Sequence, residues 1–195
     1  EALKTAAEAA GAEVRLKASV RGVELAHSGQ RTEIESGTGR EVLMSDRVWA
    51  TIPVKTLVER VAPSAPPAVV AAAAQLRLRA MLLVYLVLET DQFTEFDAHY
   101  FPEEGLPFTR VSEPKNYAAS GAPKGVTVLC AEIPCDRNDA IWSQSDSQLG
   151  ELVRHGLMRG GLPVRCRLLE VAVRRLPAAY PIYLRGYETA FEQVD

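Results

Sequence analysis

The sequence lacks a long apolar run, a cysteine framework and a strong net charge. No apolar stretch approaches the ~20 residues that a membrane-spanning helix needs, so membrane association is not indicated. A net charge of −3 is too small to indicate nucleic acid as a partner. Only three cysteines are present, without the spacing of a disulfide framework, which favours the reducing cytoplasm as the location.

The sequence gives little indication of a metal site or of nucleophilic catalysis. Cys130 and Cys135 have no second ligand pair, so we expect no zinc site and read both as small buried hydrophobic residues near a strand end. His27, His99 and His155 are expected in a turn, a strand and a helix, and no Ser-His-Asp arrangement is evident. The sequence therefore identifies no catalytic residue.

The composition is otherwise that of a globular chain. Hydrophobic residues make up 47% and charged residues 24% of the 195 positions, which suffices for a sizeable core in one domain or two unequal ones. Proline-rich residues 62–67 form the clearest linker, and we expect the domain boundary there. The sequence thus divides into residues 1–62 and residues 68–195.

The first part predicts a helix followed by a β-meander. Alanine-rich residues 2–10 end at a glycine, a natural helix stop. Residues 13–25 alternate apolar and charged positions as a half-buried strand does, and further strands are expected at residues 30–36 and 41–52. The Gly37-Thr-Gly39 turn between them precedes no helix, which indicates a hairpin rather than a phosphate-binding loop.

The second part predicts an α+β domain, in which a mixed, mostly antiparallel β-sheet carries helices on one side. Arg77–Leu88 should be a central strand, because most of it lacks the polar alternation of a strand with a solvated face. Ser145 and Gln148 form a capping box that opens a helix at residues 147–159. The other strands are expected at residues 98–101, 108–112, 126–133 and 164–176.

Two sets of segments resemble a known superfamily. The first is the helix, two-stranded excursion and return through Asp46-Arg-Val-Trp-Ala-Thr-Ile-Pro53. It resembles the mid-chain part of the FAD domain in the superfamily of amine oxidases, protoporphyrinogen oxidases and phytoene desaturases. Residues 1–62 are therefore interpreted as a partial FAD-binding lobe.

The second set consists of Asp97-Ala-His-Tyr-Phe-Pro102, Thr109-Arg-Val-Ser-Glu-Pro114 and Tyr180-Pro-Ile-Tyr183. These segments look like the substrate domain of protoporphyrinogen-oxidase-like or galactopyranose-mutase-like flavoproteins. The resemblance implies a sheet that covers the reactive face of the flavin, and an oxidoreductase that passes hydride from a C–H bond of a small-molecule substrate to FAD.

The sequence also departs from that superfamily. It contains neither the Gly-x-Gly-x-x-Gly turn nor the closing segment that contacts the flavin. We therefore expect an interior fragment whose partners include the missing FAD-domain segments of the same chain. FAD should bind the full-length protein but not this chain alone, because the pyrophosphate rests on the glycine turn and the following helix N-terminus.

The resemblance implies two cofactor contacts. Val20 matches the strand position whose backbone meets the adenine, and Pro53 matches the proline that ends the returning strand near the nucleotide. The alternatives are a core valine at Val20 and, at Pro53, the ordinary start of a helix expected at residues 54–61.

Three residues are predicted to bind the substrate. Tyr100 and Tyr180 flank proline-containing turns at strand ends and could supply a flat apolar wall. Arg110 lies in the substrate-domain segment, and its planar guanidinium suits a carboxylate or phosphate. The competing interpretation of Arg110 is an ion pair with Glu113 or with another of the many acidic residues between Glu89 and Glu151.

Two other functions remain open at this point. One is a non-catalytic module that binds a ligand or another protein through the same aromatic and arginine residues. The other is a flavin-dependent nucleotide-sugar mutase, in which the reduced flavin acts as a nucleophile. A glycine-rich segment encoded upstream would support an enzyme, whereas a stop or an unrelated domain would support the module.

Overall fold

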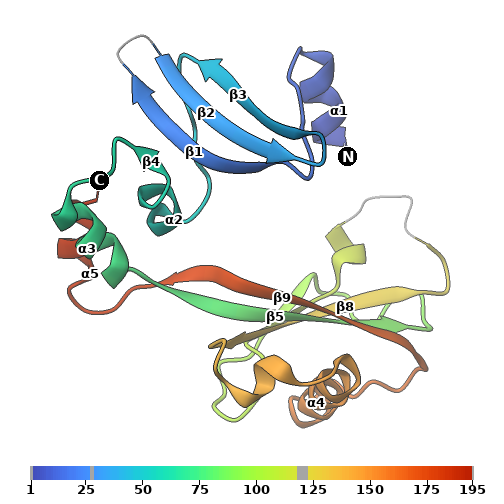
Figure 1. The fold of residues 1–195 in the computed structure, drawn as a ribbon. Helices are drawn as coiled ribbons and strands as arrows, with labels where there is room; N and C mark the ends of the chain where they lie inside the picture. Colours follow the sequence, from blue (N-terminus) through green and yellow to red (C-terminus); the bar gives the residue numbers. More distant parts are fainter. Residues whose placement is uncertain (1, 27–28, 118–122, 195) are drawn as a thin grey trace. The chain divides into compact units, whose positions relative to one another are not determined.

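The computed structural model describes residues 2–26, 29–117 and 123–194, which form two compact units (Figure 1). The first unit contains Glu1–Leu76 and Tyr183–Asp195, and the second contains Arg77–Ile182. The sequence placed the boundary at residues 62–67, whereas the units divide after Leu76. The chain's last residues return to the first unit, where α5 (Tyr187–Glu192) packs against α3 (Pro67–Gln75).

The first unit is built on a four-stranded sheet in the order β3-β2-β1-β4. The first three strands form the predicted antiparallel meander, and the Gly37-Thr-Gly39 turn joins β2 to β3 as a hairpin. Buried Val23 and Ile34 lie in this sheet. Besides α3 and α5, the first unit contains α1 (Ala2–Ala9), β1 (Ser19–Ala26), β2 (Gly29–Ser36), β3 (Gly39–Ser45), α2 (Val54–Val58) and β4 (Val61–Ala62).

Several element ends in this unit differ from the prediction. β1 begins only at Ser19 and β3 ends at Ser45, because alternation alone does not make a strand without a paired neighbour. The helix that follows Pro53 ends at Val58, and the chain then turns into β4. There the amide of Val23 donates to the carbonyl of Arg60 at 2.9 Å, which draws the chain into parallel pairing with β1.

The second unit confirms the predicted α+β architecture. Its five-stranded sheet has the order β6-β7-β8-β5-β9, and every pair of neighbouring strands is antiparallel. β5 lies between two strands, as its apolar sequence predicted. The elements are β5 (Arg77–Leu88), β6 (Ala98–Tyr100), β7 (Arg110–Ser112), a 3-10 turn (Pro114–Tyr117), β8 (Thr127–Cys135), a second 3-10 turn (Ala140–Ser143), α4 (Asp146–Arg159) and β9 (Leu168–Ile182).

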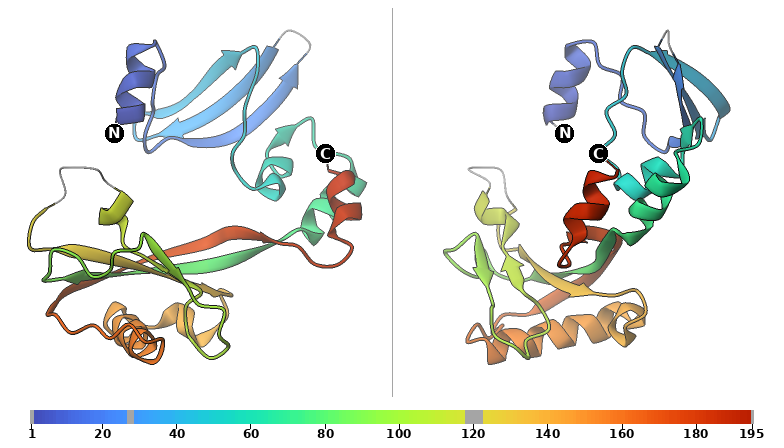
Figure 2. Two further views of the ribbon diagram at one scale, coloured as in Figure 1. Left: turned by 180° about the vertical axis from the view of Figure 1, so that it is seen from behind. Right: turned by 90° about the vertical axis from the view of Figure 1, so that its left-hand side faces the viewer.

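Helix α4 covers one face of this sheet (Figure 2). The predicted capping box is present, since Ser145 and Gln148 bond to each other's backbone amides. Two glycines let the helix approach closely. A Cβ at Gly156 would lie 2.6 Å from a ring carbon of Phe108, and one at Gly150 would lie 2.6 Å from Val171. The core between helix and sheet includes Leu82, Val84, Leu86, Leu129, Ile133, Leu149, Val153 and Leu157.

The opposite face of the sheet carries Tyr85, and we call it the Tyr85 face. Alternation along β5 places Leu83, Tyr85 and Val87 there, each half-buried. In contrast to the apolar helix-covered side, this face carries charged residues in register with Leu83 on the neighbouring strands, Glu132 on β8 and Arg174 on β9. The Tyr85 face is therefore the side of the sheet that carries charged side chains.

Cys130 and Cys135 are buried in β8, as predicted. Within the described ranges, no helix has the length and apolar character required to cross a membrane.

Candidate functional site

The three residues predicted to bind substrate lie together on the Tyr85 face. Arg110 donates from Nη1 to Oε1 of Glu132 at 2.8 Å. Tyr180 donates its hydroxyl hydrogen to Oε2 of the same carboxylate at 3.2 Å. The guanidinium carbon of Arg110 lies 5.8 Å from the centre of the Tyr100 ring. Residues from β6, β7 and β9 therefore meet around one acidic residue of β8, and we call these four residues the Glu132 cluster.

The strand register accounts for most of this arrangement. Tyr100 pairs with Arg110, and Arg110 pairs with Glu132, so the three side chains stand in one row across β6, β7 and β8. Directly paired residues have Cβ atoms about 4.5–5.5 Å apart, close enough for side chains to interact. Tyr180 pairs with Arg79 further along the sheet and reaches the row through its long side chain.

The electrostatic setting keeps both donors protonated. Burial, and then the negative charge of Glu132, raise the pKa of Tyr180 above its ordinary value. The pKa of Arg110 is also raised, first by its hydrogen bond with Tyr117 and further by the charge of Glu132. Glu132 therefore has two stable hydrogen-bond donors, one for each carboxylate oxygen.

Two nitrogen atoms of the Arg110 guanidinium have weak hydrogen bonds or none in the part of the chain that the structure describes. Its Nη2 contacts the hydroxyl of Tyr117 at a long 3.4 Å. Its Nε is buried and has no hydrogen-bond partner among the residues that the structure describes. The side chain retains 32% of its exposure, whereas that of Glu132 retains 14%. Nη2 is thus the group on Arg110 with room for another acceptor.

Arg110 forms an ion pair, as its competing interpretation held, and the acidic partner is Glu132. Glu113 is occupied elsewhere, because its fully buried carboxylate accepts from the amides of Phe93 and Thr94 at 2.9 Å each. It also accepts from the hydroxyl of Thr127 at 2.5 Å. A buried carboxylate with several donors is a stable anchor, so Glu113 ties the loop after β5 to β8.

Glu132 is the functional candidate that sequence reasoning missed. It lies in the apolar strand segment Val126-Thr-Val-Leu-Cys-Ala-Glu132. A single acid inside a buried strand needs a partner, and that signal could have identified it. The paired acids Glu103 and Glu104 are exposed, as expected for solvated turn residues.

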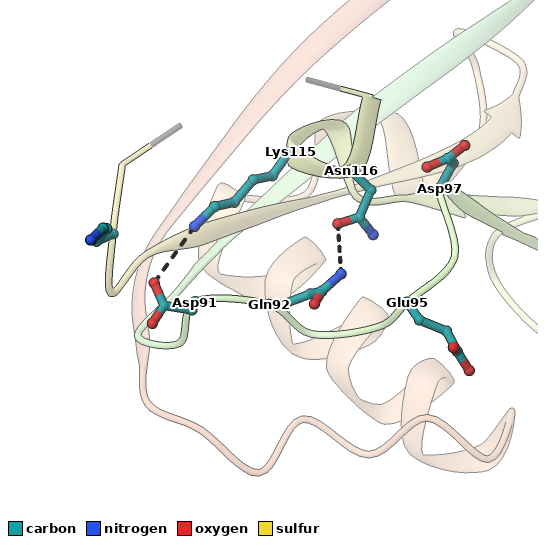
Figure 3. Close-up of a pocket in the computed structure, with 7 residues that line it drawn as sticks. Asp91, Gln92, Glu95, Asp97, Lys115 and Asn116 are labelled. Atoms are coloured by element: carbon teal, nitrogen blue, oxygen red, sulfur yellow. Dashed lines mark hydrogen bonds and ion pairs between the residues drawn. The ribbon is translucent and has the colours of Figure 1, made fainter. Parts of the chain in front are cut away.

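A polar pocket of about 440 Å³ opens beside the loop that Glu113 anchors (Figure 3). Lys115 lies 3.9 Å from Asp91 and also donates to the carbonyls of Pro123 and Val126. Gln92 donates to Asn116 at 3.0 Å. The pocket's polar groups thus bond largely to the surrounding loops, which indicates a structural role.

His99 also has a structural setting. Its Nε2 lies 3.0 Å from the hydroxyl of Thr94, and its ring contacts Phe96 edge-on and tilts against Phe101. His155 is exposed on α4, and His27 lies outside the described residues.

The residues predicted to contact a nucleotide both lie in the first unit. Val20 is in β1 with 36% exposure, and its carbonyl accepts from Nη1 of Arg60 at 2.6 Å. Pro53 is the residue immediately before α2. The Gly37-Thr-Gly39 turn leads into a strand, so it offers no helix N-terminus to a pyrophosphate. These residues fit at most one end of a dinucleotide.

Comparison with known proteins identifies a family and a fold. Residues 1–165 match the family described as flavin containing amine oxidoreductase. No curated protein matches the sequence. Among solved structures, reduced UDP-galactopyranose mutase is 19% identical with a TM-score of 0.68, and the match covers 90% of this chain and 37% of that one.

Two further structures show the same fold. A protein from Exiguobacterium sp. 255-15 named as a protoporphyrinogen oxidase is 20% identical with a TM-score of 0.62, over 93% of this chain and 39% of that one. Wild-type putrescine oxidase bound to putrescine is 19% identical with a TM-score of 0.65, over 90% and 39%. The chain therefore spans less than two fifths of the length of the structures it resembles.

Proposed function

Since this chain belongs to the family of flavin-containing amine oxidoreductases, whose cofactor is FAD, we propose that it supplies the substrate-contacting sheet of an enzyme that removes hydride from a substrate C–H bond. The flavin would accept the hydride. The residues of this chain would bind the substrate, orient the reacting bond and exclude water.

One observation carries the proposal. Tyr100, Arg110 and Tyr180 come from separate segments of the sequence, and they meet on the face of the sheet that α4 does not cover. A pair of aromatic rings beside a few fixed polar groups is the usual composition of a small-molecule site. This cluster supports assigning substrate binding to the second unit, Arg77–Ile182, rather than to all of residues 68–195.

Each residue then has a distinct role in the proposal. The exposed rings of Tyr100 and Tyr180 form the apolar wall, and Nη2 of Arg110 donates to a polar group of the substrate. In the first unit, the backbone of Val20 would meet the adenine of FAD, and Pro53 would lie near the nucleotide. No residue of this chain is assigned to proton transfer.

The test is anaerobic reduction of the flavin in the whole flavoprotein. A panel of amines and other oxidisable small molecules is mixed with the oxidised enzyme, and bleaching of the flavin absorbance is followed. Tyr180→Phe should slow bleaching by the active substrate roughly tenfold, because the ring loses the hydroxyl that binds Glu132 and with it a fixed orientation, at a cost of about 1.4 kcal/mol.

Tyr183→Phe is the matched control. Tyr183 is also an exposed tyrosine near the end of β9, but its ring packs against Tyr187. Its substitution should leave bleaching within about twofold of the wild-type rate. Equal effects of the two substitutions would contradict the assignment of the Glu132 cluster. Interconversion of isomers without net bleaching would favour a mutase, and a whole protein that contains no flavin would favour an interaction module.

A further inference from the structure

Glu132 occupies a position that no assigned role explains. It is the only acidic residue in β8, and it pairs with Arg110 on one neighbouring strand and with Leu83 on the other. Its two oxygens accept from two of the three proposed substrate contacts. Any change at Glu132 therefore acts on Arg110 and Tyr180 together.

The carboxylate also sets the charge of the site. The ion pair between Arg110 and Glu132 is formed at 2.8 Å, and both side chains are more than half buried. Such a pair is screened less than a surface pair, so the positive charge of Arg110 is largely compensated. A substrate carboxylate or phosphate would have to compete with Glu132 for Arg110 and would lie close to a second negative charge.

An uncharged polar group meets no such competition. An amide or carbonyl oxygen can accept from Nη2 of Arg110, whose contact with Tyr117 is long, while Nη1 remains bonded to Glu132. The ion pair stays intact, and no new charge is buried.

We propose that Glu132 is the specificity-determining residue of this site, and that it makes the Glu132 cluster select uncharged polar substrates over anionic ones. This inference rests on the proposed function, namely that the Tyr85 face contacts the substrate. It departs from the expectation that Arg110 anchors a carboxylate or phosphate, because the guanidinium is already paired with Glu132.

Another cation on the same face does not alter the selection. Arg174 pairs with Leu83, on the far side of β5 from Glu132, and its side chain is exposed. Solvent and salt screen an exposed charge at that separation. Arg174 is therefore a matched control position, since it is an arginine of the same face outside the cluster.

The experiment uses two probes of nearly equal shape, benzoate and its uncharged analogue benzamide. Each is titrated into the 195-residue protein while the side-chain NMR signals of Arg110 and Tyr180 are followed. The wild-type protein should bind benzamide at least as tightly as benzoate. In Glu132→Gln the preference should invert, with the ratio of benzoate to benzamide affinity rising at least tenfold, which corresponds to about 1.4 kcal/mol.

Two further variants test whether the inversion runs through Arg110. Adding Arg110→Gln to Glu132→Gln should abolish the gain in benzoate affinity, because the freed cation is then absent. Arg174→Gln should leave the ratio within about twofold of wild type. If the amide NMR spectrum shows that Glu132→Gln does not fold, the single variant Arg110→Gln replaces it in the test. In that variant Glu132 is uncompensated and should weaken benzoate binding at least threefold relative to benzamide binding.

The outcomes separate this inference from the function on which it rests. A wild-type protein that binds benzoate more tightly, with a ratio that Glu132→Gln leaves unchanged, would overturn the role of Glu132 while the face remains a ligand site. If neither probe shifts the Arg110 or Tyr180 signals in any variant, the Tyr85 face is not a ligand site, and the proposed function fails together with the inference.

Discussion

Tyr180 donates its hydroxyl hydrogen to Glu132 at 3.2 Å, although 48 positions separate the two residues in the sequence. Their strands are not neighbours, because β5 lies between β8 and β9. The hydrogen bond therefore crosses β5 and links β8 to β9. It shows that the proposed substrate contacts form one connected group of side chains, so a substitution at one should be felt at the others.

Arg110→Ala in the whole flavoprotein should lower kcat/KM by one to two orders of magnitude, on the order of 1.4–3 kcal/mol. The substitution removes the Nη2 donor and also releases Glu132 from its ion pair. Steady-state kinetics measure the effect. Flavin content should stay nearly unchanged, and the melting temperature should fall only modestly, because Tyr180 still donates to Glu132. A large loss of stability, with unaltered kinetics in the folded fraction, would make Arg110 purely structural.

The 195-residue chain should purify without colour and bind FAD weakly or not at all. The sequence has no glycine turn before a helix that could place backbone amides around a pyrophosphate, and Val20 and Pro53 alone offer little binding energy. The absorbance spectrum after gel filtration checks this. A yellow protein that keeps stoichiometric flavin through the column would contradict it.

Glu113→Gln should destabilise the second unit by about 2–3 kcal/mol. The neutral amide cannot replace a carboxylate that accepts from the amides of Phe93 and Thr94 and from Thr127, and at least one buried donor is left unpaired. Urea denaturation measures the loss. Glu103→Gln, at an exposed turn position, should change stability by less than about 0.5 kcal/mol. Similar losses in both variants would show that Glu113 is no anchor.

Gly156→Ala should lower the free energy of unfolding by about 1–3 kcal/mol. The loss is expected even though alanine is more favourable than glycine inside a helix by about 1 kcal/mol. The new Cβ would lie 2.6 Å from the ring of Phe108 and 2.9 Å from Pro107, and neither rigid side chain can yield easily. Ser147→Ala, at an exposed position of the same helix, is the control for propensity. Stabilisation by Gly156→Ala would mean that α4 does not approach the sheet this closely.

Those elements whose signals are local could be predicted from the sequence alone. Arg77–Leu88 is a strand with the bounds that its apolar run predicted, and the capping box of Ser145 and Gln148 opens α4. The Gly37-Thr-Gly39 turn joins two strands, as the lack of a following helix indicated. Each of these features depends on residues within a few positions of one another, where backbone preferences act directly.

Features that depend on a distant partner could not be predicted in this way, because long-range contacts set them. β4 exists only because β1 lies beside it, and β1 begins late because residues 13–18 do not pair. Glu132 is a site candidate only because the sheet order pairs it with Arg110 and brings it within hydrogen-bonding distance of Tyr180. Strand register and strand order arise from long-range hydrogen bonds and packing, and a residue's own neighbours in sequence carry little information about either.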